Sequence, residues 1–164
     1  MFKVNDCVVY NAMGIYRIVD IRTDKGLSDS LTEYYVMQPA FGKNMTIKTP
    51  VNNPNVLMRH IITKDNVLSL LAKKQETEKA WINDNRARNQ NFKAALKTGE
   101  CGEWIQLIKT LSLEQKEKIN IGKKLQKIDA DILKTAEKNL NEEFAIALNI
   151  SPGEVPSFIQ EHIS

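Results

Sequence analysis

The sequence predicts an α+β protein in which a small β-domain precedes an all-α domain. Short runs rich in Val, Ile, Tyr and Thr fill the first sixty residues, and no helical pattern separates them. From Thr63 onward, apolar residues recur at the period of an α-helix. This change of period places the boundary near residue 62, between domains of residues 1–62 and 63–164. The joining sequence is short and is not rich in Pro or Ser, so a long flexible tether is not expected.

The N-terminal domain contains five predicted strands that are set off by turn-forming residues such as Gly14 and Gly42. The strands recur about every twelve residues, a spacing that is typical of small barrels and sandwiches. They therefore predict a small antiparallel barrel or a strongly bent sheet. The predicted strands cover residues 7–10, 15–23, 31–39, 44–50 and 56–61.

The C-terminal domain contains predicted helices with recognisable ends. Thr63 can cap the first helix, and Gly99 can end the second in the left-handed conformation. Ser112 with Gln115 offers a capping box, so a new helix is expected to begin there. The expected helices cover residues 64–74, 76–98, 101–111, 113–125, 129–148 and 151–159.

The charge of the chain is unevenly distributed. A formal net charge of +3 is too small to indicate nucleic-acid binding by itself. However, residues 73–97 hold seven Lys/Arg against three Asp/Glu, and residues 109–127 hold six against two, whereas residues 128–164 hold two against seven. Solvated helix faces would explain each basic segment alone. Two such segments in one small helical domain favour an anionic partner.

The helix predicted over residues 76–98 carries aromatic residues among many polar ones. At about 100° per residue, one of its stripes combines apolar and polar side chains, namely Trp81, Asn85, Arg88, Phe92 and Leu96. A stripe on nearly the opposite side is polar and mostly basic, and it consists of Arg86, Gln90, Lys93 and Lys97. Two interpretations remain for Trp81: it packs on neighbouring structure, or it faces a ligand surface together with Asn85 and Arg88.

Catalytic, metal-binding and membrane-spanning functions find no support in the sequence. It has no Gly-rich phosphate loop, no GxSxG and no HExxH motif, so neither an enzyme nor a small-molecule substrate or cofactor is expected. Cys7, Cys101, His60 and His162 are isolated from one another, which argues against a metal site or a disulfide framework. The chain has no apolar run of about eighteen residues and no signal-peptide pattern, so we expect a cytoplasmic protein.

The chain contains FKVNDCVVYNAMGIYRIVDI near the N-terminus, followed by ALKTGE, LIKTL and AEKNLNEEFAIAL. These stretches, in this order and spacing, resemble the CarD family of bacterial transcription regulators. Members of that family share their N-terminal module with the RNA-polymerase-interacting domain of transcription-repair coupling factor. The resemblance reaches to about residue 150 and implies a Tudor-like bent barrel followed by a helical domain.

For the N-terminal domain, the resemblance implies docking on the β subunit of RNA polymerase through the edge of the sheet. The corresponding strand is MTIKTP, residues 45–50, which makes Thr46, Ile47 and Lys48 candidate polymerase-binding residues. Lys48 falls where the family commonly has an arginine, and lysine keeps the charge without the bidentate fork. Asp24 is a further candidate, near another position that is basic in some members.

For the helical domain, the resemblance implies contact with promoter DNA at the upstream edge of the transcription bubble, where a tryptophan acts as a wedge. The expected DNA-binding residues are Trp81, Asn85, Arg86, Arg88, Lys93 and Lys97. Alignment without gaps places Asn85 at the wedge position, and Trp81 lies four residues earlier. Three alternatives follow: Trp81 takes over the wedge, Asn85 makes a polar contact to a base edge, or the DNA is bound without a wedge.

The leading hypothesis is a non-enzymatic transcription factor that bridges the RNA polymerase β subunit and promoter DNA. Whether it activates or represses does not follow from the sequence. A second hypothesis is a polymerase-bound protein adaptor without direct DNA binding, favoured by the acidic segment after residue 128. A third interprets the N-terminal domain as a barrel of the kind found in ribosome- and RNA-associated factors.

Overall fold

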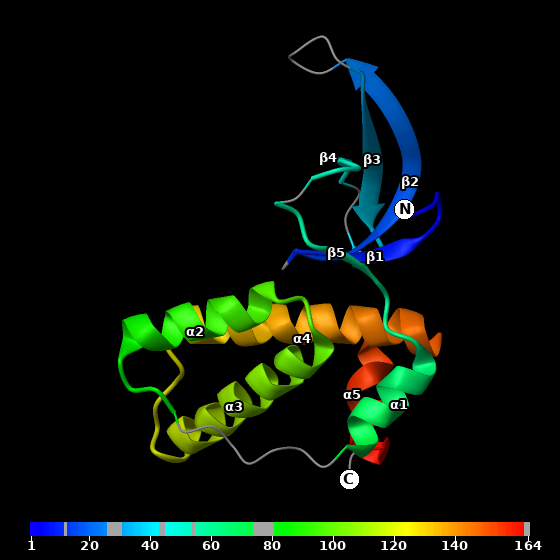
Figure 1. Cartoon of the computed structure of the whole chain (residues 1–164). Coiled ribbons are helices and arrows are strands. Elements are labelled where there is room, and N and C mark those ends of the chain that lie inside the picture. The colour runs from blue at the N-terminus through cyan, green and yellow to red at the C-terminus, as the bar shows by residue number, and fades with distance from the viewer. Residues whose placement is uncertain (12, 26–30, 43–44, 54, 74–80, 163–164) are drawn as a thin grey trace. The chain divides into compact units, whose positions relative to one another are not determined.

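The computed structural model describes residues 1–162 except 12, 26–30, 43–44, 54 and 74–80. Contacts between Cα atoms divide the chain into two units, Met1–Ile61 and Ile62–Ser164. The predicted α+β class is confirmed, because a five-stranded antiparallel sheet precedes the helices (Figure 1). We call the two parts the β unit and the helical unit.

The β unit is built on one antiparallel sheet with the strand order β4-β3-β2-β1-β5. Its strands are β1 (Cys7–Tyr10), β2 (Gly14–Lys25), β3 (Leu31–Pro39), β4 (Ile47–Pro50) and β5 (Met58–His60). β4 begins three residues later than predicted, and β5 is shorter than the predicted strand. The longest strands are β2 and β3, and β2, the central strand, curves strongly in Figure 1.

A β-bulge at Val19 contributes to this curvature. The register between β2 and β3 shifts between Ile18 and Asp20, so one extra residue enters β2 and locally increases its bend and twist. On either side of the bulge, apolar side chains still alternate toward one face. The buried cluster on that face consists of Val8, Tyr16, Ile18, Tyr35 and Met37. The bulge therefore lets a long strand bend around its core without losing the inward alternation.

The helical unit contains α1 (Lys64–Ala72), α2 (Asn85–Lys97), α3 (Cys101–Asn120), α4 (Lys127–Leu148), a short 3₁₀ turn η1 (Pro152–Glu154) and α5 (Val155–His162). Two predicted helix ends are confirmed. The Thr63 side chain accepts a hydrogen bond from the Asn66 backbone N–H at 3.2 Å, which caps α1. Gly99 follows α2 with φ +69°, a conformation that glycine adopts without a Cβ clash.

The predicted helix start at Ser112 is wrong, because α3 runs without interruption from Cys101 to Asn120. The residues around Ser112 include no Gly or Pro that would end a helix, and Leu107 and Leu111 are buried on one continuous face. A Ser with Gln three residues later marks a helix start only where the preceding helix also ends. Here burial of the apolar face overrides the local capping signal.

The predicted start of the second helix is also wrong. Residues 76–80 of the expected helix lie outside the described residues, and residues 81–84 are not helical. The helix α2 begins at Asn85 with Asp84 at its N-cap, a position that Asp favours. Trp81 therefore precedes α2 and does not lie on its surface stripe.

A buried carboxylate, Glu143, holds the start of the helical unit in place. One of its oxygens accepts a hydrogen bond from the Ile62 backbone N–H at 2.8 Å, and the other accepts one from the Cys101 thiol at 3.1 Å. The side chain is fully buried on α4. It thus joins α4 both to the first residue of the unit and to the first turn of α3.

The core of the helical unit lies between α2, α3 and α4. The buried residues of its main cluster are Phe92, Leu107, Leu111, Ile132, Leu133 and Ala136. Trp104 is fully buried, and its indole N–H donates to the Leu96 carbonyl at 3.1 Å. Phe92 and Trp104 thus both belong to the core of the helical unit.

A buried ion pair crosses this core between Arg88 of α2 and Asp129 of α4, whose side chains are only 3% and 1% exposed. The Arg88 guanidinium donates to both carboxylate oxygens, over 3.2 Å from Nε and 2.8 Å from Nη2. It also donates from Nη1 to the Ile82 carbonyl at 3.0 Å. Bidentate geometry and the additional acceptor compensate the guanidinium for the loss of its hydration.

Asp129→Asn is expected to lower the free energy of unfolding by about 3 to 5 kcal/mol, because it leaves the buried Arg88 charge without a counter-charge. Urea denaturation followed by circular dichroism measures this difference. Asp131→Asn is the matched control, because Asp131 is an exposed residue of the same helix. Equal stability of the two variants would contradict the assigned role of the pair.

Candidate functional site

β4 forms one edge of the described sheet, and β5 forms the other. This strand pairs with β3 on one side, from Met37–Ile47 to Tyr34–Pro50, and is last in the strand order of the described sheet. Pro50 fits this position, because proline lacks the N–H that an interior strand would donate. The backbone on the outer side of β4 is thus placed where another strand could add to the sheet.

Side chains alternate along β4 as expected for a half-buried strand. Ile47 packs against the core cluster of the β unit and Thr49 is buried, whereas Lys48 points outward and is exposed. Thr46 precedes the strand and is also exposed. Of the four predicted polymerase-binding residues, Lys48 and Thr46 have exposed side chains. The Ile47 side chain instead packs against the core of the β unit.

Asp24 and Lys48 form an exposed ion pair. The Lys48 ammonium lies 2.9 Å from the Asp24 carboxylate, with the two side chains 48% and 47% exposed, and 5.9 Å from the centre of the Tyr34 ring. A second pair lies on the same face of β2, where Arg22 Nε donates to Asp20 at 2.7 Å. That hydrogen bond lowers the pKa of the Asp20 carboxyl. The outer face near β4 therefore presents paired charges of both signs.

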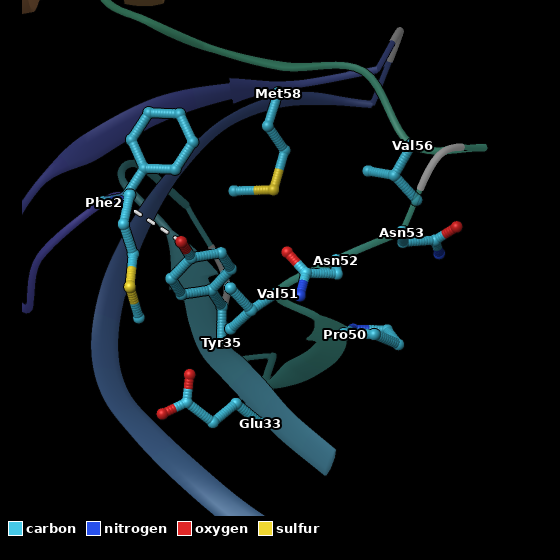
Figure 2. A pocket seen from close by; sticks show the side chains of 10 residues that line it. Phe2, Glu33, Tyr35, Pro50, Val51, Asn52, Asn53, Val56 and Met58 are labelled. Atoms are coloured by element: carbon cyan, nitrogen blue, oxygen red, sulfur yellow. Dashed lines mark hydrogen bonds between the residues drawn. The ribbon is translucent and has the colours of Figure 1, made fainter.

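A hollow in the β unit begins beside the C-terminal end of β4 (Figure 2). Its volume is about 440 Å³, and its lining combines apolar side chains such as Phe2 and Met58 with polar ones such as Glu33 and Asn52. The Phe2 backbone N–H donates to the Tyr35 hydroxyl at 3.1 Å, which holds the N-terminal residues against the sheet. Nothing in the sequence indicated this hollow, because its walls are formed by residues from the beginning of the β unit, such as Phe2, and from its end, such as Met58.

The predicted DNA-binding residues of the helical unit separate into two groups. Four of them are exposed on α2, namely Asn85, Arg86, Lys93 and Lys97. Arg86, Lys93 and Lys97 lie within about 40° of one another around the helix axis, because their spacings of seven and four residues are close to whole turns. They form one basic stripe that we call the α2 stripe.

Arg88 does not belong to this exposed surface. Its guanidinium is buried against Asp129 and the Ile82 carbonyl, so it does not face a phosphate in this structure. The expectation of a DNA-facing Arg88 is thus inconsistent with its burial. Nothing in the sequence indicated Asp129 as a partner, since it lies 41 residues away and Asp84 is the nearer acidic residue.

Trp81 packs against the core from outside α2. Its ring lies 4.7 Å from the Arg88 guanidinium carbon and 5.8 Å from the centre of the Phe92 ring. If α2 began earlier, the Ile82 carbonyl would accept a backbone hydrogen bond within the helix. In the structure this carbonyl accepts a hydrogen bond from the Arg88 side chain instead. Of the two interpretations of Trp81, the structure supports packing on neighbouring structure.

The acidic segment of residues 128–164 is less acidic at its surface than in its sequence. Three of its seven acidic side chains are buried, namely Asp129, Glu142 and Glu143. Burial raises the pKa of the Glu142 carboxyl, although its ion pair with Lys138 at 3.3 Å acts in the opposite direction. Among the described residues, no group of three His, Cys, Asp or Glu could hold a metal ion.

None of the described helices is both long enough and apolar enough to cross a membrane. Comparison with curated proteins gave no match. Two family models match, however, and they follow the two units. Residues 2–62 match the CarD-like/TRCF RID domain, and residues 66–160 match the CarD C-terminal domain. Together they cover nearly the whole chain, which therefore belongs to the CarD family, the RNA-polymerase-interacting transcription regulators that it resembles in sequence.

Proposed function

We propose that the protein regulates transcription by bridging two partners. Its β unit binds the β subunit of RNA polymerase, and its helical unit contacts promoter DNA at the upstream edge of the open bubble. The observation that carries this proposal is the open edge of β4 in a domain that matches the RID family model. The bridge needs neither a cofactor nor a catalytic residue, because its effect is to change the lifetime of the open complex.

Strand addition on β4 is the proposed mode of polymerase binding. An incoming strand would form backbone hydrogen bonds with the outer side of β4 and place its own side chains beside Lys48. The exposed Lys48–Asp24 pair can be exchanged at low cost, since such pairs contribute at most about 1 kcal/mol. A partner carboxylate near the edge would then take over the ammonium of Lys48.

The α2 stripe is the proposed DNA contact of the helical unit. From Arg86 to Lys97 it extends over about 16 Å at the rise of an α-helix. Its three cations can neutralise successive phosphates along one groove edge. Such contacts position a protein on DNA without reading sequence, which suits a factor that acts at many promoters.

Of the three alternatives for the wedge, binding through α2 without a tryptophan wedge has the most support. Trp81 is half-buried beneath the Arg88 guanidinium, whereas Asn85 is exposed at the start of α2. In this proposal Trp81 packs against the N-terminal end of α2 on the side away from the DNA. Asn85 and Arg86 are the residues nearest the DNA.

A protein adaptor without DNA binding is the second candidate. It is favoured by the four exposed acidic residues of the last segment, namely Asp131, Glu137, Glu154 and Glu161. These carboxylates would repel DNA phosphates if they faced the same groove as the α2 stripe. The salt dependence of DNA binding distinguishes the two candidates.

Lys48→Glu is expected to weaken binding to the polymerase β subunit, because it replaces an exposed cation at the sheet edge and places a second anion beside Asp24. Titration of the purified full chain against the β subunit measures the change in Kd. Lys3→Glu, an exposed site outside β4, is the matched control. Unchanged affinity of Lys48→Glu would remove β4 from the interface.

Replacing the three cations of the α2 stripe with glutamine is expected to reduce the slope of log K against log[salt] for a forked promoter fragment by about 3, or about 0.9 for each phosphate that is no longer neutralised. The control carries the same number of charge removals at the exposed residues Lys64, Lys73 and Lys134. A slope equal to that of the unmodified protein would contradict the assignment, and absence of binding by the unmodified protein would favour the adaptor.

Trp81→Ala is expected to lower the free energy of unfolding by about 2 kcal/mol, because it removes packing on Phe92 and the stacked Arg88 guanidinium. Thermal melting measures the loss, and Asn83→Ala, an exposed change in the same segment, serves as the comparison. If Trp81→Ala kept the wild-type stability and shortened the lifetime of the open complex, Trp81 would instead act as the wedge.

A further inference from the structure

The hollow of the β unit lies on one face of the sheet, and Lys48 lies on the other. Tyr35 lines the hollow, whereas the ring of Tyr34 lies 5.9 Å from the Lys48 ammonium. These two tyrosines are neighbours on β3, and neighbouring side chains of a strand point to opposite faces. Lys48 and the hollow can therefore bind two different side chains of one partner.

The edge that β4 forms extends as far as the hollow. The Val51 backbone N–H donates to the Glu33 carbonyl at 3.0 Å, so the chain stays beside β3 for one residue beyond Pro50. Val51 lies three residues after Lys48, a distance of about 10 Å along an extended strand. A strand that adds to β4 would thus pass both Lys48 and a residue that lines the hollow.

The lining of the hollow combines apolar surface with one charge. The rings of Phe2 and Tyr35 lie with their centres 6.0 Å apart and their planes at 70°, and Val51 and Met58 add aliphatic surface. Among the described lining residues, Glu33 has the one charged side chain. Figure 2 shows this side chain on the same side of β3 as the Tyr35 ring. The charge therefore lies beside the apolar surface.

The Glu33 carboxylate is accessible to a partner. It is exposed, and it forms no ion pair within the described part of the chain. Lysine and arginine side chains pack their aliphatic stems on apolar surface while the charged end reaches polar groups. A carboxylate beside an apolar hollow matches that combination.

An apolar or an acidic occupant fits this lining less well. An apolar side chain would remove water from the Glu33 carboxylate without supplying a counter-charge, which costs free energy. An acidic side chain would be repelled by the same carboxylate. Charge complementarity thus favours a basic occupant.

We propose that the hollow is a specificity site for a lysine or arginine side chain of the strand that adds to β4. The aliphatic stem of that side chain packs on Phe2, Val51 and Met58, and its cation pairs with the Glu33 carboxylate. This inference rests on the proposed strand addition and adds to it the chemistry of one partner residue.

The partner strand then carries opposite charges on its two faces. A carboxylate on one face pairs with Lys48, and a basic residue on the other face enters the hollow. Side chains on opposite faces are an odd number of residues apart, and a spacing of three matches that of Lys48 and Val51. A strand shifted by one residue would bring like charges together, so the two sites select register as well as partner.

Titration of the purified full chain against the polymerase β subunit tests the charge of Glu33. Glu33→Gln is expected to raise the Kd by about threefold, as for the loss of one exposed ion pair. Glu33→Lys is expected to raise it by about tenfold or more, because two cations then meet. Glu103→Lys, at an exposed acidic residue of α3, is the matched control. Equal affinity of Glu33→Lys and Glu103→Lys would overturn the proposal.

Two asparagines after β4 allow a matched test of the space in the hollow. Both Asn52 and Asn55 are exposed, and Asn52 is among the described lining residues whereas Asn55 is not. Asn52→Trp is expected to fill the hollow and to weaken binding by about tenfold, because it excludes a buried partner side chain. Asn55→Trp should bind as the unmodified protein does. Equal affinity of these two variants would show that the hollow stays empty in the complex.

Charge reversal on the partner identifies the occupant. Each lysine and arginine in the β-subunit segment that the full chain protects from hydrogen exchange is replaced in turn with glutamate. One of these variants should restore the affinity of Glu33→Lys, as a double-mutant cycle measures. Failure of every variant to restore it would overturn the assignment of a basic occupant. Thermal melting verifies folding, and these changes at exposed sites should melt at the wild-type temperature.

Lys48→Glu separates this inference from the proposed function. If Lys48→Glu weakens binding while Glu33→Lys and Asn52→Trp do not, strand addition is retained and the hollow is not part of the interface. If Asn52→Trp weakens binding while Glu33→Lys does not, the occupant is apolar and the proposed basic side chain is wrong. If none of the three changes affects the affinity, both the inference and the proposed polymerase contact fail.

Discussion

The buried pair of Arg88 and Asp129 determines how one end of the helical unit is organised. Removing both charges from water is costly, and two hydrogen bonds between them plus one to the Ile82 carbonyl offset that cost. The pair joins the first turn of α2 to the first turn of α4. It also fixes the position of Trp81, whose ring lies on the guanidinium. The α2 stripe depends on this connection, because it lies on a helix that the pair holds.

Because some carboxylates are buried, the net charge of the chain does not describe the charge at its surface. Asp129 and Glu143 contribute negative charge to the sequence but act inside the helical unit, where they accept hydrogen bonds from Arg88, Ile62 and Cys101. Their charges lie away from any partner that approaches the surface. The cations of α2 and of the α3–α4 turn are mostly exposed. The exposed cations, and not the formal charge of +3, therefore set the field that a polyanion meets at this end.

Features with local signals could be predicted from the sequence, and features that depend on distant partners could not. The caps at Thr63 and Gly99 were predictable because a cap is decided within a few residues. The burial of Arg88 depends on a carboxylate 41 residues away, and the Lys48–Asp24 pair joins residues 24 apart. The uninterrupted α3 shows the same limit, because tertiary burial of Leu107 and Leu111 outweighs the capping pattern at Ser112. The basic character of residues 109–127 was visible in the sequence, but the exposure of Ile119 and Ile121 was not, because apolar residues in a helical segment are expected to be buried.

The open edge of β4 also affects how the protein behaves toward copies of itself. Any unpaired strand edge can pair with the same edge of another molecule and begin aggregation. β4 has only four residues, ends in Pro50 and carries Lys48 at its exposed position. Two copies that met through β4 would form few hydrogen bonds and would bring their lysines toward each other. The strand is therefore poorly suited to self-association, whereas a partner strand that places a negative charge beside Lys48 would gain from pairing with it.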